Sequence, residues 1–102
     1  MEGVAEMAFV QIIDFKTDRG EEVDAFFEGW EPPPGGTVRR VIVTQDRDDA
    51  TRRLHIVFFD SYESAMENSG LPEIDALAAK MAEFVSEPPK FYNLDVIEDM
   101  TV

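Results

Sequence analysis

The sequence contains no cysteine among its 102 residues. This absence excludes disulfide bridges, thiolate zinc sites, iron–sulfur clusters and cysteine nucleophiles, and it fits a reducing compartment. No apolar run approaches the roughly 20 residues needed to span a bilayer. The opening segment, residues 1–7, carries acidic but no basic side chains, unlike a secretory signal. We therefore expect a cytoplasmic protein.

Basic residues are scarce, with 9 Lys and Arg against 22 Asp and Glu, which gives a formal net charge of -13. A surface of this sign repels phosphate backbones and anionic membranes, because proteins bind both through Lys and Arg. We expect neither nucleic acid nor a membrane as a partner, and we interpret the acidic surface as an aid to solubility. The chain also has no GxSxG, Walker, GxGxxG or HExxH motif.

The length and a hydrophobic share of 44% suit one globular domain, residues 1–102, with a core at about 7–98. Hydrophobic periodicity and chain breakers divide the chain into alternating elements. Strands are predicted at residues 7–15, 37–45, 52–59 and 91–98, and helical segments at about 21–30, 61–68 and 72–85. The last two form one helical unit that is broken at Gly70.

The sequence also predicts which residues begin and end the helices. Asp18 and Glu21 have the spacing of an N-cap residue and its reciprocal acid. Ser61 is the expected cap of the second helix, and Gly70 is the residue type that ends helices in the left-handed conformation. Pro72 suits the first turn of the helix that follows.

The resulting βαββαβ order is the split-βαβ motif, and it predicts a ferredoxin-like α+β fold with a four-stranded antiparallel sheet and helices on one face. Such a sheet should alternate apolar and polar residues. The third strand does not, because Leu54 and Ile56 point to one face while Val57 and Phe59 point to the other. The uncovered face would expose a large apolar patch. We expect a homodimer in which two such sheets face each other.

Two segments carry a resemblance to a known family. Residues 58–69 (FFDSYESAMENS) and 89–96 (PKFYNLDV) resemble the strand-to-helix junction and the last strand of antibiotic-biosynthesis-monooxygenase-like proteins, within the dimeric α+β barrel superfamily. The resemblance implies a cavity in each protomer between helices and sheet. It also implies cofactor-free oxygenation of polycyclic phenols, haem degradation or an uncharacterised role. Haem-degrading relatives ligate iron with a helix histidine, where this chain offers Asn68, so we expect no cofactor and no metal.

The one histidine, His55, is the only side chain with an unperturbed pKa near neutrality. A lone strand histidine is more often a packing or hydrogen-bonded interface group than a catalyst, which needs a positioned partner. If Leu54 and Ile56 face the helices, His55 lies in the dimer interface.

Aromatic residues provide the other candidates. Trp30 ends an apolar stripe on the first helix, where it belongs either to the core or to the wall of an aromatic-binding pocket. The same space could be lined by Tyr62, Tyr92, Phe26, Phe27 and Phe91, and a ligand could be oriented by Asn68 and Asn93. The residues that we single out as ligand-binding candidates are Trp30, Tyr62, Asn68, Tyr92 and His55.

Charged residues cluster on the predicted hairpin. Strand alternation turns one arginine of each pair, Arg39-Arg40 and Arg52-Arg53, toward the interior, where it forms an ion pair or an anion clamp. Asp46 begins an acidic run that lacks the ligand spacing of a calcium loop, so we interpret this run as a solvated turn.

Three functions remain open. The leading hypothesis is a dimer that binds a small apolar or aromatic molecule in its cavity. The alternative is a cofactor-independent monooxygenase in which Trp30, Tyr62, Asn68 and Tyr92 position a phenolic ring. The third is a structural or regulatory dimer with a filled interior, which a structure without a pocket larger than a few waters would favour.

Overall fold

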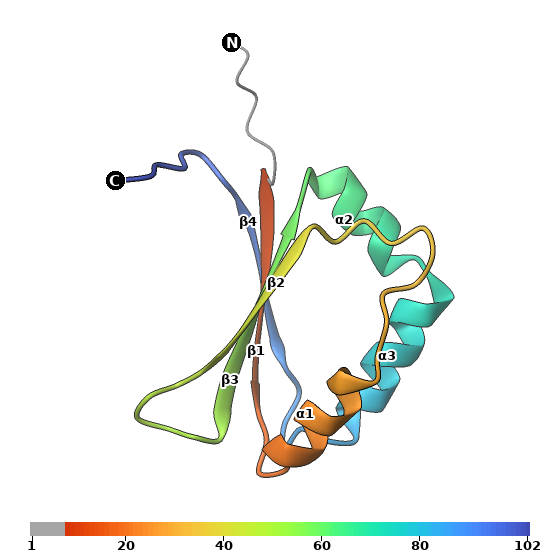
Figure 1. Ribbon diagram of the computed structural model, residues 1–102, viewed down its shortest axis with the longest axis vertical. Helices are drawn as coiled ribbons and strands as arrows, with labels where there is room; N and C mark the ends of the chain where they lie inside the picture. The colour runs from red at the N-terminus through yellow and green to blue at the C-terminus, as the bar shows by residue number, and fades with distance from the viewer. Residues whose placement is uncertain (1–7) are drawn as a thin grey trace.

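A computed structural model describes residues 8–102. It contains one four-stranded sheet with the helices on one face (Figure 1). The elements in chain order are β1 (Phe9–Lys16), α1 (Gly20–Glu28), β2 (Arg40–Gln45), β3 (Arg52–Phe59), α2 (Tyr62–Ser69), α3 (Pro72–Ala82) and β4 (Lys90–Asp95). The sheet order is β2-β3-β1-β4 and every pairing is antiparallel. The predicted ferredoxin-like α+β fold is confirmed, although the predicted first residue of β1, Met7, lies outside the described residues.

The two faces of the sheet follow from the register of the central strands. Phe9 of β1 lies opposite Phe59 of β3, and both are buried beneath the helices. They form the core cluster with Ala65 of α2. Because side chains alternate along a strand, the odd-numbered residues of β1 and β3 face the helices and the even-numbered residues face away. His55 is therefore on the helix face. Leu54 and Ile56 face away from the helices, so the condition that would place His55 in the dimer interface is not met.

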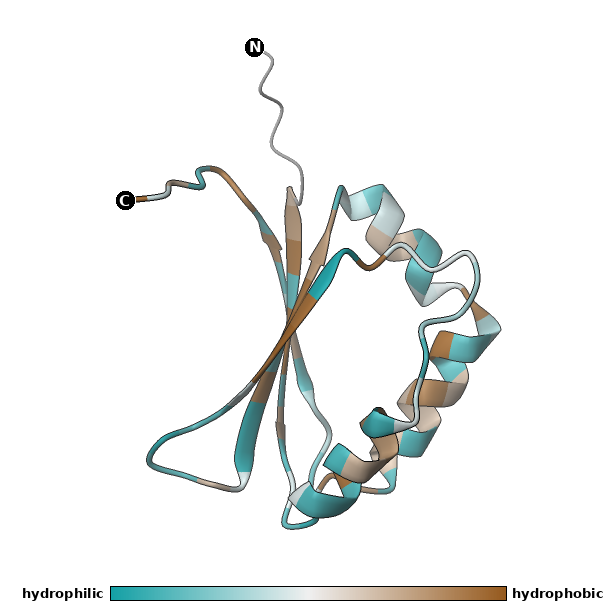
Figure 2. Cartoon of the chain, viewed as in Figure 1, coloured by the Kyte–Doolittle hydropathy of each residue, from teal (hydrophilic) through white to brown (hydrophobic). Residues whose placement is uncertain are grey.

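The face away from the helices is uncovered in the single chain (Figure 1). Figure 2 shows hydrophobic segments along the strands and a hydrophilic hairpin between β2 and β3. Apolar side chains gather over the middle of the open face: Val10, Ile12, Ile42, Leu54, Ile56, Phe58, Tyr92 and Leu94. Within residues 8–102, each helix is too short or too polar to cross a bilayer.

The start of α1 differs from the prediction. The helix begins at Gly20 with Arg19 as its N-cap residue, and no side chain of residues 8–102 caps it. Asp18 does not cap it because the chain turns earlier, at Thr17. The Thr17 hydroxyl accepts a hydrogen bond from the Arg19 backbone N–H at 2.9 Å and donates one to the Phe84 carbonyl at 2.6 Å. The turn before α1 is thus tied to the end of the α3 region.

The cap of α2 is confirmed. The Ser61 hydroxyl accepts from the Ser64 backbone N–H at 3.0 Å, and the Ser64 hydroxyl accepts from the Ser61 N–H at 3.1 Å. Gly70 ends α2 but has φ -82° and ψ -6°, so the left-handed expectation is wrong. The chain does not reverse there, because extended Leu71 leads directly into Pro72 at the start of α3.

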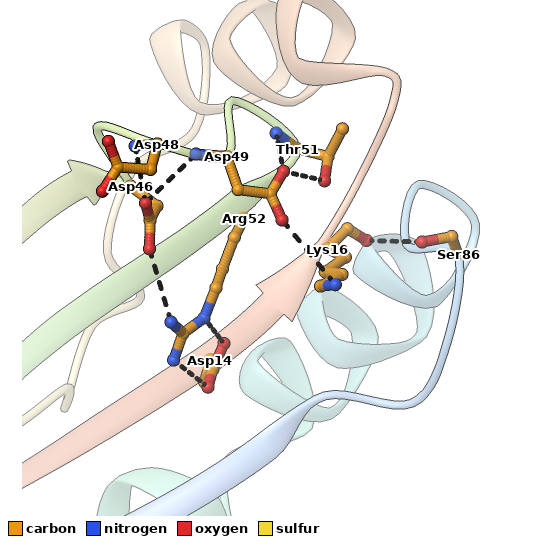
Figure 3. Close-up of polar contacts among 8 residues, drawn as sticks. All are labelled: Asp14, Lys16, Asp46, Asp48, Asp49, Thr51, Arg52 and Ser86. Carbon is orange, nitrogen blue, oxygen red and sulfur yellow. Dashed lines mark hydrogen bonds and ion pairs between the residues drawn. The ribbon is translucent and has the colours of Figure 1, made fainter.

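The hairpin between β2 and β3 uses its acidic residues internally (Figure 3). The Asp46 carboxylate accepts from the backbone N–H groups of Asp48 and Asp49 at 2.8 and 3.1 Å. Arg52 donates to Asp14 at 2.9 Å and to Asp46 at 3.4 Å. The hydrogen bonding between Arg52 and Asp14 lowers the pKa of the Asp14 carboxyl. The acidic run is therefore a hydrogen-bonded turn linked to β1.

Candidate functional site

A cavity of about 440 Å³ lies between the helices and the sheet. Ligand sites commonly enclose roughly 300–1,000 Å³, and a water occupies only about 30 Å³. The floor comes from the odd-numbered residues of β1 and β3: Gln11, Ile13, Phe15, His55, Val57 and Phe59. A cavity of this size does not fit the filled-interior hypothesis.

The cavity exists because α3 does not pack tightly on the sheet. None of its residues is buried, although its periodic hydrophobic residues Ile74, Leu77 and Met81 line the cavity. Beside them stand Ala78 and Ala82, whose small side chains leave the space open. The apolar side of α3 therefore lines the cavity instead of packing into a core.

His55 occupies the floor and is 8% exposed. Its ring lies edge-on to Phe15 and Phe27, with centroid distances of 5.0 and 5.5 Å. Neither ring nitrogen has a hydrogen-bond partner among residues 8–102, and Nε2 is shielded from solvent. Burial lowers the pKa of His55, the Arg53 charge lowers it further, and Asp24 partly opposes both. A neutral imidazole offers one donor and one acceptor.

Arg53 is the inward arginine of its pair and is 9% exposed. Its guanidinium donates to both carboxylate oxygens of Asp24 on α1, at 2.7 and 3.3 Å. These hydrogen bonds lower the pKa of Asp24. The predicted ion pair is confirmed, and because Asp24 holds both terminal nitrogens, Arg53 does not serve as an anion clamp.

Trp30 and Asn68 line the cavity on its helix side. Trp30 packs edge-on to Phe27 at a centroid distance of 6.0 Å. Asn68 is 6% exposed, and its side-chain oxygen accepts from the Thr37 backbone N–H at 3.2 Å. The Thr37 hydroxyl in turn donates to the Ser64 carbonyl at 2.5 Å. Asn68 therefore fastens the segment between α1 and β2 to α2, which fixes one wall of the cavity.

Tyr62 and Tyr92 do not share this cavity lining. Tyr62 is 51% exposed and packs edge-on to Phe9, with centroids 5.5 Å apart. Tyr92 pairs with Ile12 and so lies on the open face, 42% exposed. Its neighbour Phe91 lines the cavity instead. The structure thus places Trp30, Asn68 and His55 around one cavity and the two tyrosines elsewhere.

Sequence reasoning missed Gln11 on the floor, whereas Phe91 was among the aromatic residues expected beside the cavity. The Gln11 side-chain nitrogen donates to the Asn93 side-chain oxygen at 3.0 Å. A glutamine in the middle of an apolar strand was the available signal for a polar group inside. Phe91 shares its face with His55 because both pair with Ile13 of β1.

Comparisons with known proteins define the fold. No family model matches the chain, and no curated protein matches it. Solved structures do. A Streptomyces coelicolor monooxygenase in complex with nanaomycin D has a TM-score of 0.77 at 16% identity, covering 93% of this chain and 92% of that one. A Mycobacterium tuberculosis protein gives 0.73 at 14% identity, covering 91% and 98%.

A third solved structure, a proposed antibiotic biosynthesis monooxygenase of Nitrosomonas europaea, has a TM-score of 0.70 at 16% identity and covers 91% of this chain and 93% of that one. The chain therefore has an α+β fold of the ferredoxin-like type. More narrowly, its fold is that of antibiotic-biosynthesis-monooxygenase-like proteins, as the resemblance implied.

Proposed function

We propose that this protein binds a small apolar or aromatic molecule in the cavity between its helices and its sheet. The observation that carries the proposal is the cavity itself, about 440 Å³ with a mostly apolar lining that includes Trp30, Asn68 and His55. Apolar walls supply the binding free energy, and a few polar groups orient the ligand.

A fluorescent probe tests this function. N-phenyl-1-naphthylamine should bind saturably with enhanced emission, because its rings leave water for the cavity. Ala78→Phe fills the cavity from α3 and should abolish that binding. Ala79→Phe is the matched control, because Ala79 neighbours Ala78 on α3 but is absent from the cavity lining. Equal binding by the two variants, or no saturable binding by the native chain, contradicts the proposal.

A cofactor-independent monooxygenase acting on a phenolic substrate is the second candidate. It is supported by the neutral His55 on the cavity floor, which offers an acceptor for a phenol proton. The solved monooxygenase in complex with nanaomycin D has the same fold. Oxygen uptake with quinol substrates that is lost in Trp30→Ala and His55→Gln would favour catalysis. Probe binding without oxygen uptake would favour a binding protein.

We further propose that the chain forms a homodimer through the open sheet face. Its apolar centre includes Ile12, Ile56 and the exposed Tyr92 and Leu94, and a second copy of the same sheet is self-complementary about a two-fold axis. Ile56→Glu should yield monomers in sedimentation velocity at micromolar concentration. Val43→Glu should stay dimeric, because Val43 is 57% exposed on the other face. A native chain that sediments only as a monomer contradicts this assembly.

The net charge bears on two other classes of partner, nucleic acids and membranes. The net charge of -13 supports a protein without nucleic-acid or membrane partners, and we propose a cytoplasmic location. Fractionation of cells that express the tagged chain tests the location, and a gel-shift assay at low salt tests nucleic-acid binding.

A further inference from the structure

We propose that the cavity admits uncharged molecules and rejects molecules that carry a carboxylate, sulfonate or phosphate group. This inference rests on the proposed binding function and specifies the charge class of the ligand.

The first argument is the charge of the cavity wall. Among the described residues that line the cavity there is no Lys and no Arg, and the charged member is Asp75 on α3. An anion that entered would leave its hydration shell without gaining a cationic partner. It would also approach the Asp75 carboxylate. Both effects oppose its entry.

The second argument is that the nearby basic groups are already neutralised. His55 lines the floor, but its burial and the neighbouring Arg53 charge keep the imidazole neutral at pH 7. Arg53 is two residues away on the same strand, yet both terminal nitrogens are bound to Asp24 and it does not line the cavity. Neither side chain supplies the cation that an anionic ligand needs.

The third argument is the kind of polar group that remains. Gln11, His55 and Asn68 all line the cavity as neutral side chains. Such groups can satisfy a hydroxyl, a carbonyl or an amine of an otherwise apolar ligand at little electrostatic cost. The lining therefore fits an uncharged molecule with one or a few hydrogen-bonding groups.

A matched pair of probes tests the inference. N-phenyl-1-naphthylamine and 8-anilinonaphthalene-1-sulfonate share the same aromatic skeleton and differ by the sulfonate. Titrations at about 0.5 M salt suppress the long-range field of the whole chain and leave short-range effects. We expect the neutral probe to bind at least about tenfold more tightly, because an unpaired charge is costly to desolvate.

Two variants that each remove one negative charge separate the effect of the cavity wall from the effect of the net charge. Asp75→Asn should strengthen binding of the sulfonate probe about threefold or more and leave the neutral probe unchanged, because it removes a charge beside the ligand. Glu73→Gln changes the net charge equally on the same helix but lies outside the lining, and should change neither affinity.

The outcomes are distinct. Sulfonate binding as tight as neutral binding, and sensitive to Ala78→Phe, overturns the charge selection and leaves the binding function in place. Equal effects of Asp75→Asn and Glu73→Gln overturn its assignment to the cavity wall. Absence of saturable binding by either probe overturns the proposed function and this inference with it.

Discussion

Arg53 of β3 and Asp24 of α1 form a bidentate ion pair in which Arg53 is buried and the Asp24 side chain is 57% exposed. The pair links the sheet to α1 directly beside the cavity floor. Arg53 also lies two residues from His55 on the same face of β3. One contact therefore fixes a helix and sets the electrostatic surroundings of the only histidine.

We predict that Asp24→Asn destabilises the fold by about 1–2 kcal/mol. The substitution leaves the buried Arg53 charge without its counter-charge, and the partial exposure of Asp24 keeps the loss below that of a fully buried pair. Urea unfolding measures the change. Glu28→Gln is the control, because Glu28 is exposed on the same helix and should change stability by less than about 0.5 kcal/mol. Equal effects would show that the ion pair contributes nothing.

The second prediction concerns His55 and pH. Burial and Arg53 lower its pKa below the ordinary value of 6.5. The unfolded chain then binds more protons below that value, so stability is complete above about pH 6.5 and falls as the pH drops toward the folded pKa. The imidazole resonances of the one histidine give the folded midpoint by NMR. His55→Gln should flatten the stability loss in this window, and a midpoint at or above 6.5 would refute the assignment.

The fold was predictable because its signals are local. Prolines, glycines and β-branched runs mark the elements, and β3 lies at the predicted residues, Arg52–Phe59. The helix termini were less predictable, because they depend on distant partners. Thr17 turns the chain before α1 by binding Phe84, which lies 67 residues away in sequence. No local pattern reports such a contact.

The site was predictable only in part. Trp30, Asn68 and His55 were candidates from the sequence and all three line the cavity. Alternation alone could not say which face of β3 meets the helices, so it left His55 either in the cavity or in the dimer interface. The same ambiguity made Tyr92 as plausible as Phe91, since adjacent strand residues point to opposite faces. The register that pairs both Phe91 and His55 with Ile13 resolves it. The bond from Thr37 to Asn68 spans 31 residues and leaves no sequence signature.

The third prediction tests that bond. Asn68→Ala removes the acceptor of the Thr37 N–H and should destabilise the fold by about 1–3 kcal/mol, because a part-buried donor loses its partner. Hydrogen exchange at the Thr37 amide should accelerate. Ser69→Ala is the control on the same turn of α2, since the Ser69 hydroxyl donates to the Ala65 carbonyl within the helix. An unchanged Thr37 exchange rate in Asn68→Ala would contradict the role of Asn68 as an anchor.

The last prediction uses the close approach of Gly20 to Arg53. A Cβ atom at Gly20 would stand 2.7 Å from a terminal nitrogen of Arg53, whereas one at Gly29 would meet no atom of the described residues within 4 Å. Alanine favours helices over glycine by about 1 kcal/mol in a helix interior, so propensity alone predicts no penalty at the first position of α1. We expect the steric clash to outweigh the helix propensity, because the ion pair with Asp24 holds the guanidinium in this position.

Gly20→Ala should therefore lower the free energy of unfolding by about 1–2 kcal/mol, as a lost ion pair and a displaced buried charge would. Gly29→Ala should be neutral or stabilise by up to about 1 kcal/mol, since it only restricts the unfolded chain. Urea unfolding of the two variants measures the contrast. In Gly20→Ala the His55 NMR midpoint should also shift, because the Arg53 charge moves relative to the imidazole. If Gly20→Ala is as stable as Gly29→Ala and leaves that midpoint unchanged, Arg53 is free to adjust and does not fix the electrostatics of the cavity floor.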